Sequence, residues 1–405
     1  MNTQTSQFLK ILKMFFDEQK EFMSEEPVDW SLLSKMARKQ NLLPIFFEAA
    51  NNCEDYINSD IYTKDQMDTY AMVAAQIQRS SAFLEIYEKI TKEGIYPIVM
   101  KGIVCRQLYG EMSDHRPSGD EDILIEPKDF QKVKEILEKE HYVCSNSEIT
   151  DRELAKVQEV SFHNLQQSLH VDVHNNMIGN QNSERAQMNS LFLNVHAHGQ
   201  MVEINGTPVK VLEPTESLLF LILHSYKHFQ NRGVGIRQVL DILLYYKANR
   251  QKINMEKLQS SLCTCSAEGF WSDILYIGYT YLGLCEERPE SVCCPEELIQ
   301  DMMQTGVFGE DEKSDHIAAR MNLAADDSAN KRGKLYRLLC VSFPKRQVLL
   351  DGYPFLEEKP WLLPFVWGKR WKKFLKYAKK DVWKLSREIL EKNSARMEDI
   401  KKYKN

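Results

Sequence analysis

The sequence predicts an α+β fold in which a mixed sheet is flanked by helical regions on both sides. Near the N-terminus, apolar residues recur at three- and four-residue spacing, which is typical of helices. Strand-like runs follow up to about residue 212, and from Pro214 the pattern is helical again. Because 405 residues exceed one ordinary core, we expect three regions. These are an N-terminal helical region (1–62), a mixed core (63–212) and a C-terminal helical domain (213–405).

The N-terminal region and the start of the core are predicted to be helical. Residues 8–59 show helical spacing interrupted at Pro27 and Pro44. A longer helix is expected over residues 64–92, and Gly94 ends it. We expect these helices to pack against the sheet.

The core is predicted to contain several strands and one helix. The helix begins at Pro127 and runs to residue 142, with a proline suited to a first turn. One hairpin turns at Asn205-Gly206, a pair that favours tight two-residue turns. The expected strands are residues 95–100, 119–126, 159–164 and 169–175, followed by the hairpin at 201–212.

The C-terminal region begins with two strongly apolar helices, predicted over residues 216–229 and 236–247. Near the end, the segment from Lys369 to Arg387 is dense in Lys and Arg and has apolar residues at helical spacing. Such a helix is able to bind nucleic acid or an anionic membrane. We favour the simpler interpretation, a helix that buries its apolar stripe against the protein and leaves its lysines in solvent.

Composition favours a cytoplasmic protein without a general affinity for nucleic acid. The formal net charge is −6, so any basic surface must be local. Nine cysteines are scattered without disulfide-framework spacing, which favours a reducing compartment. No secretion signal is recognised, and no segment approaches the roughly 20 apolar residues that span a bilayer. The Cys263/Cys265 and Cys293/Cys294 pairs lack zinc-ribbon spacing.

Three aspartates form the most informative pattern. Asp120 and Asp122 lie at i and i+2 of a predicted strand, so their carboxylates project to one side. On a later strand, His170, Asp172 and His174 share one face opposite two valines. Clustered carboxylates need positive charge between them, and divalent cations commonly supply it. The pattern therefore predicts a Mg²⁺ site for phosphoryl or nucleotidyl transfer, although a polar strand face is the simpler alternative for Asp172.

Several further motifs accompany the aspartates between roughly residues 63 and 250. They are Lys101-Gly102, a helix ending in Tyr109-Gly110, Arg116, GDEDILI, LHVDVH and the helical stretch LLFLILHSYKHF followed by IRQVLDILLYY. Together they resemble the uncharacterised nucleotidyltransferase family, which belongs to the DNA polymerase beta-like nucleotidyltransferase superfamily. The resemblance implies a mixed-sheet nucleotidyltransferase core, an NTP as donor, and transfer of a nucleoside monophosphate with release of pyrophosphate.

The resemblance also implies residue roles. Asp120, Asp122 and Asp172 match the metal-binding and catalytic acids, which would hold two Mg²⁺ ions. Gly102 matches the glycine that lets a triphosphate approach the backbone. The serine that follows this glycine in the superfamily is absent, and Lys101 is expected to contact phosphate instead.

Other basic residues are candidates for binding the nucleotide. Arg116 lies in a loop that could reach a phosphate, and His224 and Lys227 lie on the first C-terminal helix. His224 and His228 are four residues apart and share a helix face, so they could bind a metal or a phosphate. Together with Asp241 they resemble the site of a His/Asp phosphohydrolase, but the adjacent His-Asp pair of that fold is missing.

Two other functions remain open from the sequence. One is a toxin-like nucleotidyltransferase that modifies a tRNA or a protein, for which the basic segment should line the active site. The other is a non-catalytic descendant that only binds nucleotide. The acceptor and the preferred base are not encoded in a recognisable motif.

Overall fold

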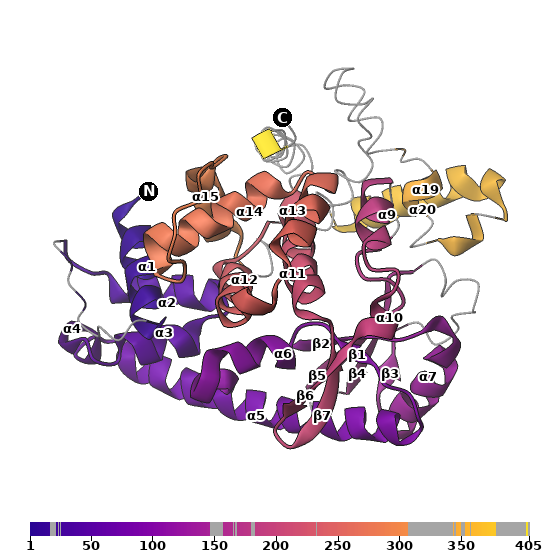
Figure 1. Ribbon diagram of the computed structural model, residues 1–405, viewed down its shortest axis with the longest axis horizontal. Coiled ribbons are helices and arrows are strands. Elements are labelled where there is room, and N and C mark those ends of the chain that lie inside the picture. Colours follow the sequence, from indigo (N-terminus) through magenta and orange to yellow (C-terminus); the bar gives the residue numbers. More distant parts are fainter. Residues whose placement is uncertain are drawn as a thin grey trace.

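The computed structural model describes most of the chain, including a seven-stranded mixed sheet (Figure 1). The described residues are 1–16, 22, 24, 26–145, 157–164, 166, 168–179, 183–231, 233–306, 343, 346–349, 353–356, 358–377 and 402–403. The strands are β1 (Ile98–Val99), β2 (Asp120–Leu124), β3 (Val143–Cys144), β4 (Glu159–Asn164), β5 (Leu169–His174), β6 (Gln200–Ile204) and β7 (Thr207–Val211). The predicted α+β fold class is confirmed.

The strand order is β3-β4-β5-β2-β1-β7-β6. The two predicted hairpins, β4–β5 and β6–β7, are antiparallel, and Asn205 and Gly206 turn the second one with positive φ angles. At the centre, β2 pairs in parallel with β5, and this pairing sets Asp122 opposite Asp172. The two strands join segments about fifty residues apart in the sequence.

The faces of β2 meet different helices because successive residues point to opposite sides. Ile123 and Ile125 pack with α5 (Tyr62–Lys92) and α7 (Phe130–Lys139) in one apolar core. Leu124 packs in a second core with α11 (Pro214–Asn231) and α12 (Ile236–Asn249). Figure 1 shows α5 along the bottom of the molecule, and α11 and α12 above the central strands. Asp120 and Asp122 lie on the same face of β2 as Leu124, because they precede it by four and two residues. Their side chains therefore point to the side covered by α11.

The N-terminal and C-terminal helical regions share the second core rather than forming separate layers. Helix α1 packs against α3 near the N-terminus and against the π-helical turn η4 (Gly278–Leu282) far along the chain. The N-terminal helices are α1 (Thr3–Phe16), α2 (Trp30–Lys39), α3 (Leu43–Ala50) and α4 (Glu54–Ile57). The division into three domains at residues 62 and 212 stays a prediction.

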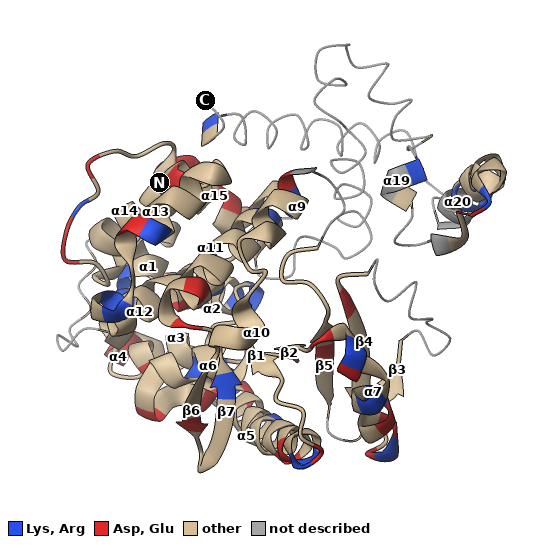
Figure 2. Ribbon diagram, turned by 45° about the vertical axis from the view of Figure 1, so that its right-hand side comes forward, with Lys and Arg blue, Asp and Glu red and all other residues tan. Residues whose placement is uncertain are grey.

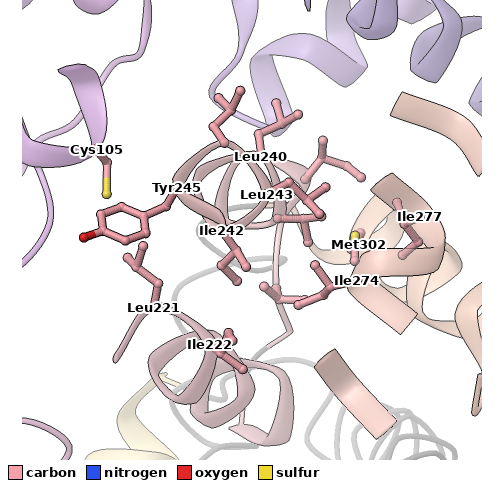
Figure 3. Close-up of a cluster of buried hydrophobic side chains, with 14 of the residues drawn as sticks. Cys105, Leu221, Ile222, Leu240, Ile242, Leu243, Tyr245, Ile274, Ile277 and Met302 are labelled. Atoms are coloured by element: carbon pink, nitrogen blue, oxygen red, sulfur yellow. The ribbon is translucent and has the colours of Figure 1, made fainter. Parts of the chain in front are cut away.

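Helix α12 forms the centre of this shared core. Figure 3 shows Ile242 directed toward Ile222 of α11, with Ile274 of α14 (Glu268–Ile277) nearby, and Tyr245 extending toward Cys105. Cys105 belongs to α6 (Ile103–Arg106), the short helix directly after Gly102, and its side chain is buried. The C-terminal helices therefore pack on the segment that follows Lys101.

The remaining described helices complete the C-terminal region and the connections. They are η1 (Gln107–His115), η2 (Pro127–Asp129), α9 (Ser183–Ser190), α10 (Val195–His198), η3 (Arg250–Lys252), α13 (Met255–Thr264), α14 (Glu268–Ile277), α15 (Pro295–Thr305), α19 (Arg346–Leu349), η5 (Pro354–Leu356), η6 (Pro360–Leu362) and α20 (Leu363–Tyr377). None of the described helices has the length and apolar character needed to cross a membrane.

The predicted basic helix is described only in its first part, as the end of α20. Figure 2 marks basic residues on α20, and both views place this helix at the edge of the molecule. Its Val366 packs in a small core with Leu349 and Leu356, separate from the two large cores. Residues 378–387 lie outside the described residues, so the choice between a packed helix and a nucleic-acid-binding helix stays a prediction.

Candidate active site

Three aspartates meet where β2 and β5 run side by side. Asp122 lies opposite Asp172, and Asp120 precedes Asp122 by two residues on the same face. One carboxylate oxygen from each lies within 4.8 Å of the other two. The Asp122 side chain is 3% exposed and that of Asp120 is 44% exposed, so the cluster extends from the interior to the surface. The sequence expectation that these acids share one side is therefore met.

A lysine and a histidine contact Asp122. His174 Nε2 lies 2.8 Å from Asp122 Oδ1, and Lys101 Nζ lies 3.1 Å from Asp122 Oδ2. Lys101 Nζ is also 3.9 Å from Asp120 Oδ2. Burial alone would raise the pKa of Asp122, but Lys101 and His174 hold it below its usual range. Asp122 is therefore ionised at neutral pH.

The same charges act on the neighbouring groups. Burial favours a neutral Lys101, but Asp122 and Asp120 raise the pKa of its ammonium above the usual value. Burial, together with the charges of Asp122 and Glu159, raises the pKa of Asp172 to about 6. The cluster therefore concentrates negative charge that a single lysine and a histidine only partly balance.

The donor set suits a hard divalent cation. Asp122 Oδ2 is buried and has no hydrogen bond of acceptable geometry among the described residues. Carboxylate oxygens are the ligands that Mg²⁺ prefers, and one or two carboxylates plus substrate oxygens commonly complete its shell. Asp120, Asp122 and Asp172 therefore fit the Mg²⁺ site that the sequence predicts.

Gly102 is constrained by a carboxylate on the opposite face of β2. Its backbone has φ 64° and ψ −114°, and an added Cβ would lie 2.0 Å from Glu121 Oε2. Glu121 accepts hydrogen bonds from the Ile103 amide at 2.7 Å and from Arg106 Nη2 at 2.5 Å. The first amide of α6 is thus already bonded to protein. The role expected of Gly102 in phosphate binding stays a prediction, and the close contact with Glu121 gives an independent reason for glycine.

Glu121 and Arg106 were not singled out from the sequence. Both side chains are 1% exposed, and Arg106 also donates to Ser118 Oγ at 2.5 Å. Glu121 lies between two aspartates of a strand, so its side chain must point to the opposite face. A carboxylate on the apolar face of a strand needs a buried polar or cationic partner, and this is a signal that the sequence contains. The identity of that partner depends on tertiary structure.

Arg116 is buried and pairs with Asp241 of α12. Its Nε and Nη2 donate to the two carboxylate oxygens at 2.9 and 2.5 Å, and Tyr109 donates to Asp241 Oδ1 at 3.0 Å. Arg116 Nη1 is buried and has no hydrogen-bond partner among the described residues. Two of its three nitrogens are therefore used in joining the core to the C-terminal helices, and the expected phosphate contact stays a prediction.

Helix α11 brings His224 next to Lys101. His224 Nε2 lies 3.4 Å from Lys101 Nζ and 2.8 Å from His228 Nε2. Burial, together with the charges of Lys101 and His228, lowers the pKa of His224 well below its usual value, so its ring is neutral. Asp241 pairs with Arg116, and it does not gather with the two histidines into a group of metal-ligating side chains within the described part of the chain.

Lys227, one helical turn after His224, is half-buried. Its Nζ donates to Gln158 Oε1 at 3.0 Å, and burial lowers its pKa to about 8. On the same helix, His224 contacts the Lys101 ammonium. Whether His224 and Lys227 bind nucleotide stays a prediction.

A second group of potential ligands lies on the C-terminal helices. Ligand atoms of Asp273, Cys293 and Cys294 lie within 4.8 Å of one another. The Asp273 carboxylate accepts hydrogen bonds from the amides of Cys293 and Cys294 and from the Tyr403 hydroxyl. These bonds satisfy the carboxylate with protein donors, so Asp273 is explained as a structural acceptor.

Comparison with known proteins gives one result that bears on this site. A family model described as uncharacterised nucleotidyltransferase matches residues 26–281, which is more than half of the chain and includes all three aspartates. No curated protein and no solved structure matches the chain significantly. With its α+β core and its acidic triad of Asp120, Asp122 and Asp172, the chain belongs to the uncharacterised nucleotidyltransferase family.

Proposed function

We propose that the protein is a Mg²⁺-dependent enzyme that transfers a nucleoside monophosphate from an NTP to a hydroxyl or phosphate acceptor. The observation that carries the proposal is the meeting of three carboxylates from two strands at one point. Membership of a nucleotidyltransferase family supports the same reaction class. The acceptor oxygen attacks the α-phosphorus, the bond from that phosphorus to the β-phosphate oxygen breaks, and pyrophosphate leaves.

The chain's own residues have separate roles in this proposal. Asp120, Asp122 and Asp172 hold Mg²⁺, two ions being the expected number. When bound, Mg²⁺ supplies positive charge that stabilises the transferring phosphoryl group. Asp172, from the neighbouring strand, accepts the proton of the incoming acceptor hydroxyl.

Basic residues around the cluster orient the triphosphate. Lys101 is adjacent to two of the aspartates, and His224 contacts Lys101 from α11. Lys227 and Arg116 add positive charge on α11 and on the loop before β2. Gly102 allows a backbone conformation that places Lys101 next to the carboxylates.

The test is Asp120→Asn, because this side chain is exposed enough to change without loss of folding. We expect Mg²⁺-dependent release of labelled pyrophosphate from γ-labelled NTPs to fall by on the order of 100-fold or more. Asp60→Asn is the matched control, since Asp60 is an exposed aspartate outside the cluster. Turnover that survives Asp120→Asn unchanged would exclude the proposed site. Mg²⁺-dependent binding of ATP or CTP without any turnover would identify a non-catalytic nucleotide-binding protein instead.

A further inference from the structure

The Lys101 ammonium lies against the carboxylates that are expected to bind metal. Its Nζ is 3.1 Å from Asp122 Oδ2 and 3.9 Å from Asp120 Oδ2. We propose that Lys101 is an internal counter-ion of the acidic cluster, which Mg²⁺ displaces when it binds and which then becomes free to contact the NTP phosphates. This inference rests on the proposed function, since it assumes that the cluster is the metal site.

The two oxygens of Asp122 differ in how they are held. Oδ1 is fixed by His174 at 2.8 Å on the buried side. Oδ2 is buried and faces the Lys101 ammonium at 3.1 Å. Lys101 and Asp122 Oδ2 form a charged contact at 3.1 Å, and a divalent cation that binds the same oxygen would replace the ammonium there.

A metal ion and the ammonium compete for the same oxygens. Mg²⁺ binds oxygen at about 2.0–2.1 Å and carries twice the charge of an ammonium. If Mg²⁺ bound Asp120 and Asp122 while Lys101 stayed in place, two cations would be adjacent in a largely buried site. The lysine side chain is a flexible four-carbon stem, so its charge can move away while the backbone stays fixed.

His224 gives the Lys101 ammonium an uncharged neighbour on the α11 side of the cluster. Its Nε2 is 3.4 Å from Lys101 Nζ, and the ring is neutral. A neutral imidazole nitrogen can accept a hydrogen bond from the ammonium, whereas a protonated ring would repel it. The Lys101 side chain is 21% exposed, so it also has access to solvent and to an incoming phosphate.

The displacement of Lys101 implies that metal binds before the triphosphate. Without metal, Lys101 is engaged with Asp120 and Asp122 and is a poor ligand for a triphosphate. With metal bound, the same ammonium is released beside the cluster. Metal should therefore strengthen nucleotide binding partly through Lys101, and removal of Lys101 should have opposite effects on the two ligands.

The experiment measures Mn²⁺ binding in the absence of nucleotide, using electron paramagnetic resonance of the free ion. Lys101→Met should tighten Mn²⁺ binding about 10-fold or more, while Lys101→Arg, which keeps the charge, should leave the affinity close to wild type. Lys92→Met is the matched control, since it removes one positive charge from an exposed helix end. Asp122→Asn should abolish the binding in every background.

The outcomes separate the two proposals. If Mn²⁺ binds in an Asp122-dependent way but Lys101→Met leaves the affinity unchanged or weaker, the displacement of Lys101 is wrong and the metal site stands. If neither wild type nor Lys101→Met binds Mn²⁺ through Asp122, the proposed function fails as well.

A second measurement follows the Lys101 side chain in the wild-type protein and uses Lys101→Arg only to assign its resonance. After ¹³C-methylation of the lysines, the resonance missing from Lys101→Arg should shift when Mg²⁺ is added. A resonance that stays in place at saturating Mg²⁺ would overturn the inference.

Discussion

Replacement of Gly102 by alanine tests how the turn before the acidic strand is built. Gly102 has φ 64° and ψ −114°, and Gly110 has φ 60° and ψ −131°. An alanine in this sparsely populated region costs about 1–3 kcal/mol wherever it occurs. An added Cβ at Gly110 would meet no atom within 4 Å, whereas at Gly102 it would lie 2.0 Å from Glu121 Oε2. The two glycines therefore share the backbone cost and differ in the contact.

The contact at Gly102 should dominate the loss of stability. The Glu121 carboxylate must move, and it is bonded to the Ile103 amide and to the buried Arg106 guanidinium. Disruption of a buried ion pair costs about 3–5 kcal/mol. Adding the backbone cost, we expect Gly102→Ala to lower the free energy of unfolding by about 4–8 kcal/mol. Gly110→Ala should lower it by about 1–3 kcal/mol.

The assay is urea unfolding followed by circular dichroism and by tryptophan fluorescence, with the midpoint and slope compared between variants. Gly102→Ala should also be measured in a Glu121→Ala background, where the carboxylate is absent and only the backbone cost should remain. Equal destabilisation by Gly102→Ala and Gly110→Ala, within about 0.5 kcal/mol, would refute the reasoning. So would an undiminished effect in the Glu121→Ala background.

Two further predictions concern contacts that join the core to the C-terminal helices. Asp241→Asn leaves the buried Arg116 guanidinium without its charged partner, so it should lower the free energy of unfolding by about 3–5 kcal/mol in urea. Replacement of both Arg116 and Asp241 by leucine should recover much of this loss. A double variant as unstable as Asp241→Asn would contradict the assignment. Tyr403→Phe removes the hydroxyl that donates to Asp273 at 2.6 Å and should cost about 1–3 kcal/mol, seen as a lower melting temperature, while Tyr279→Phe at an exposed ring should have little effect. Equal melting temperatures for the two tyrosine variants would show that the Tyr403 bond does not stabilise the fold.

Local patterns in the sequence predicted the features that depend on local geometry. Alternation along LHVDVH correctly separated the valines from Asp172 and His174, because side chains on a strand point to opposite faces in turn. Asn205-Gly206 predicted its hairpin because both residues adopt positive φ angles. The strand expected over residues 95–100 is limited to Ile98–Val99, since Pro97 has no amide hydrogen to donate to a neighbouring strand.

Features that depend on partners distant in sequence were not predictable in the same way. The parallel register of β2 and β5 decides that Asp122 meets Asp172, and no short motif encodes it. The pairing of Arg116 with Asp241 spans 125 residues, so from sequence alone Arg116 was assigned only by its closeness to Asp120. The shared core of the N-terminal and C-terminal helices is likewise a tertiary property, because both regions show the same helical periodicity.

The segment Asp120-Glu121-Asp122 explains how one strand can position both the acids and the cation beside them. The outer two residues point toward α11 and form the acidic cluster with Asp172, while Glu121 points to the opposite face. On that face its carboxylate accepts a hydrogen bond from the Ile103 amide and lies so close to Gly102 that position 102 has no room for a Cβ atom. Lys101 directly precedes this turn, so Glu121 fixes the backbone from which the ammonium reaches back to Asp122. Residues on both faces of β2 therefore position Lys101 Nζ 3.1 Å from Asp122 Oδ2: Glu121 fixes the backbone that follows the lysine, and Asp122 supplies the charge. His224 contacts the lysine from α11.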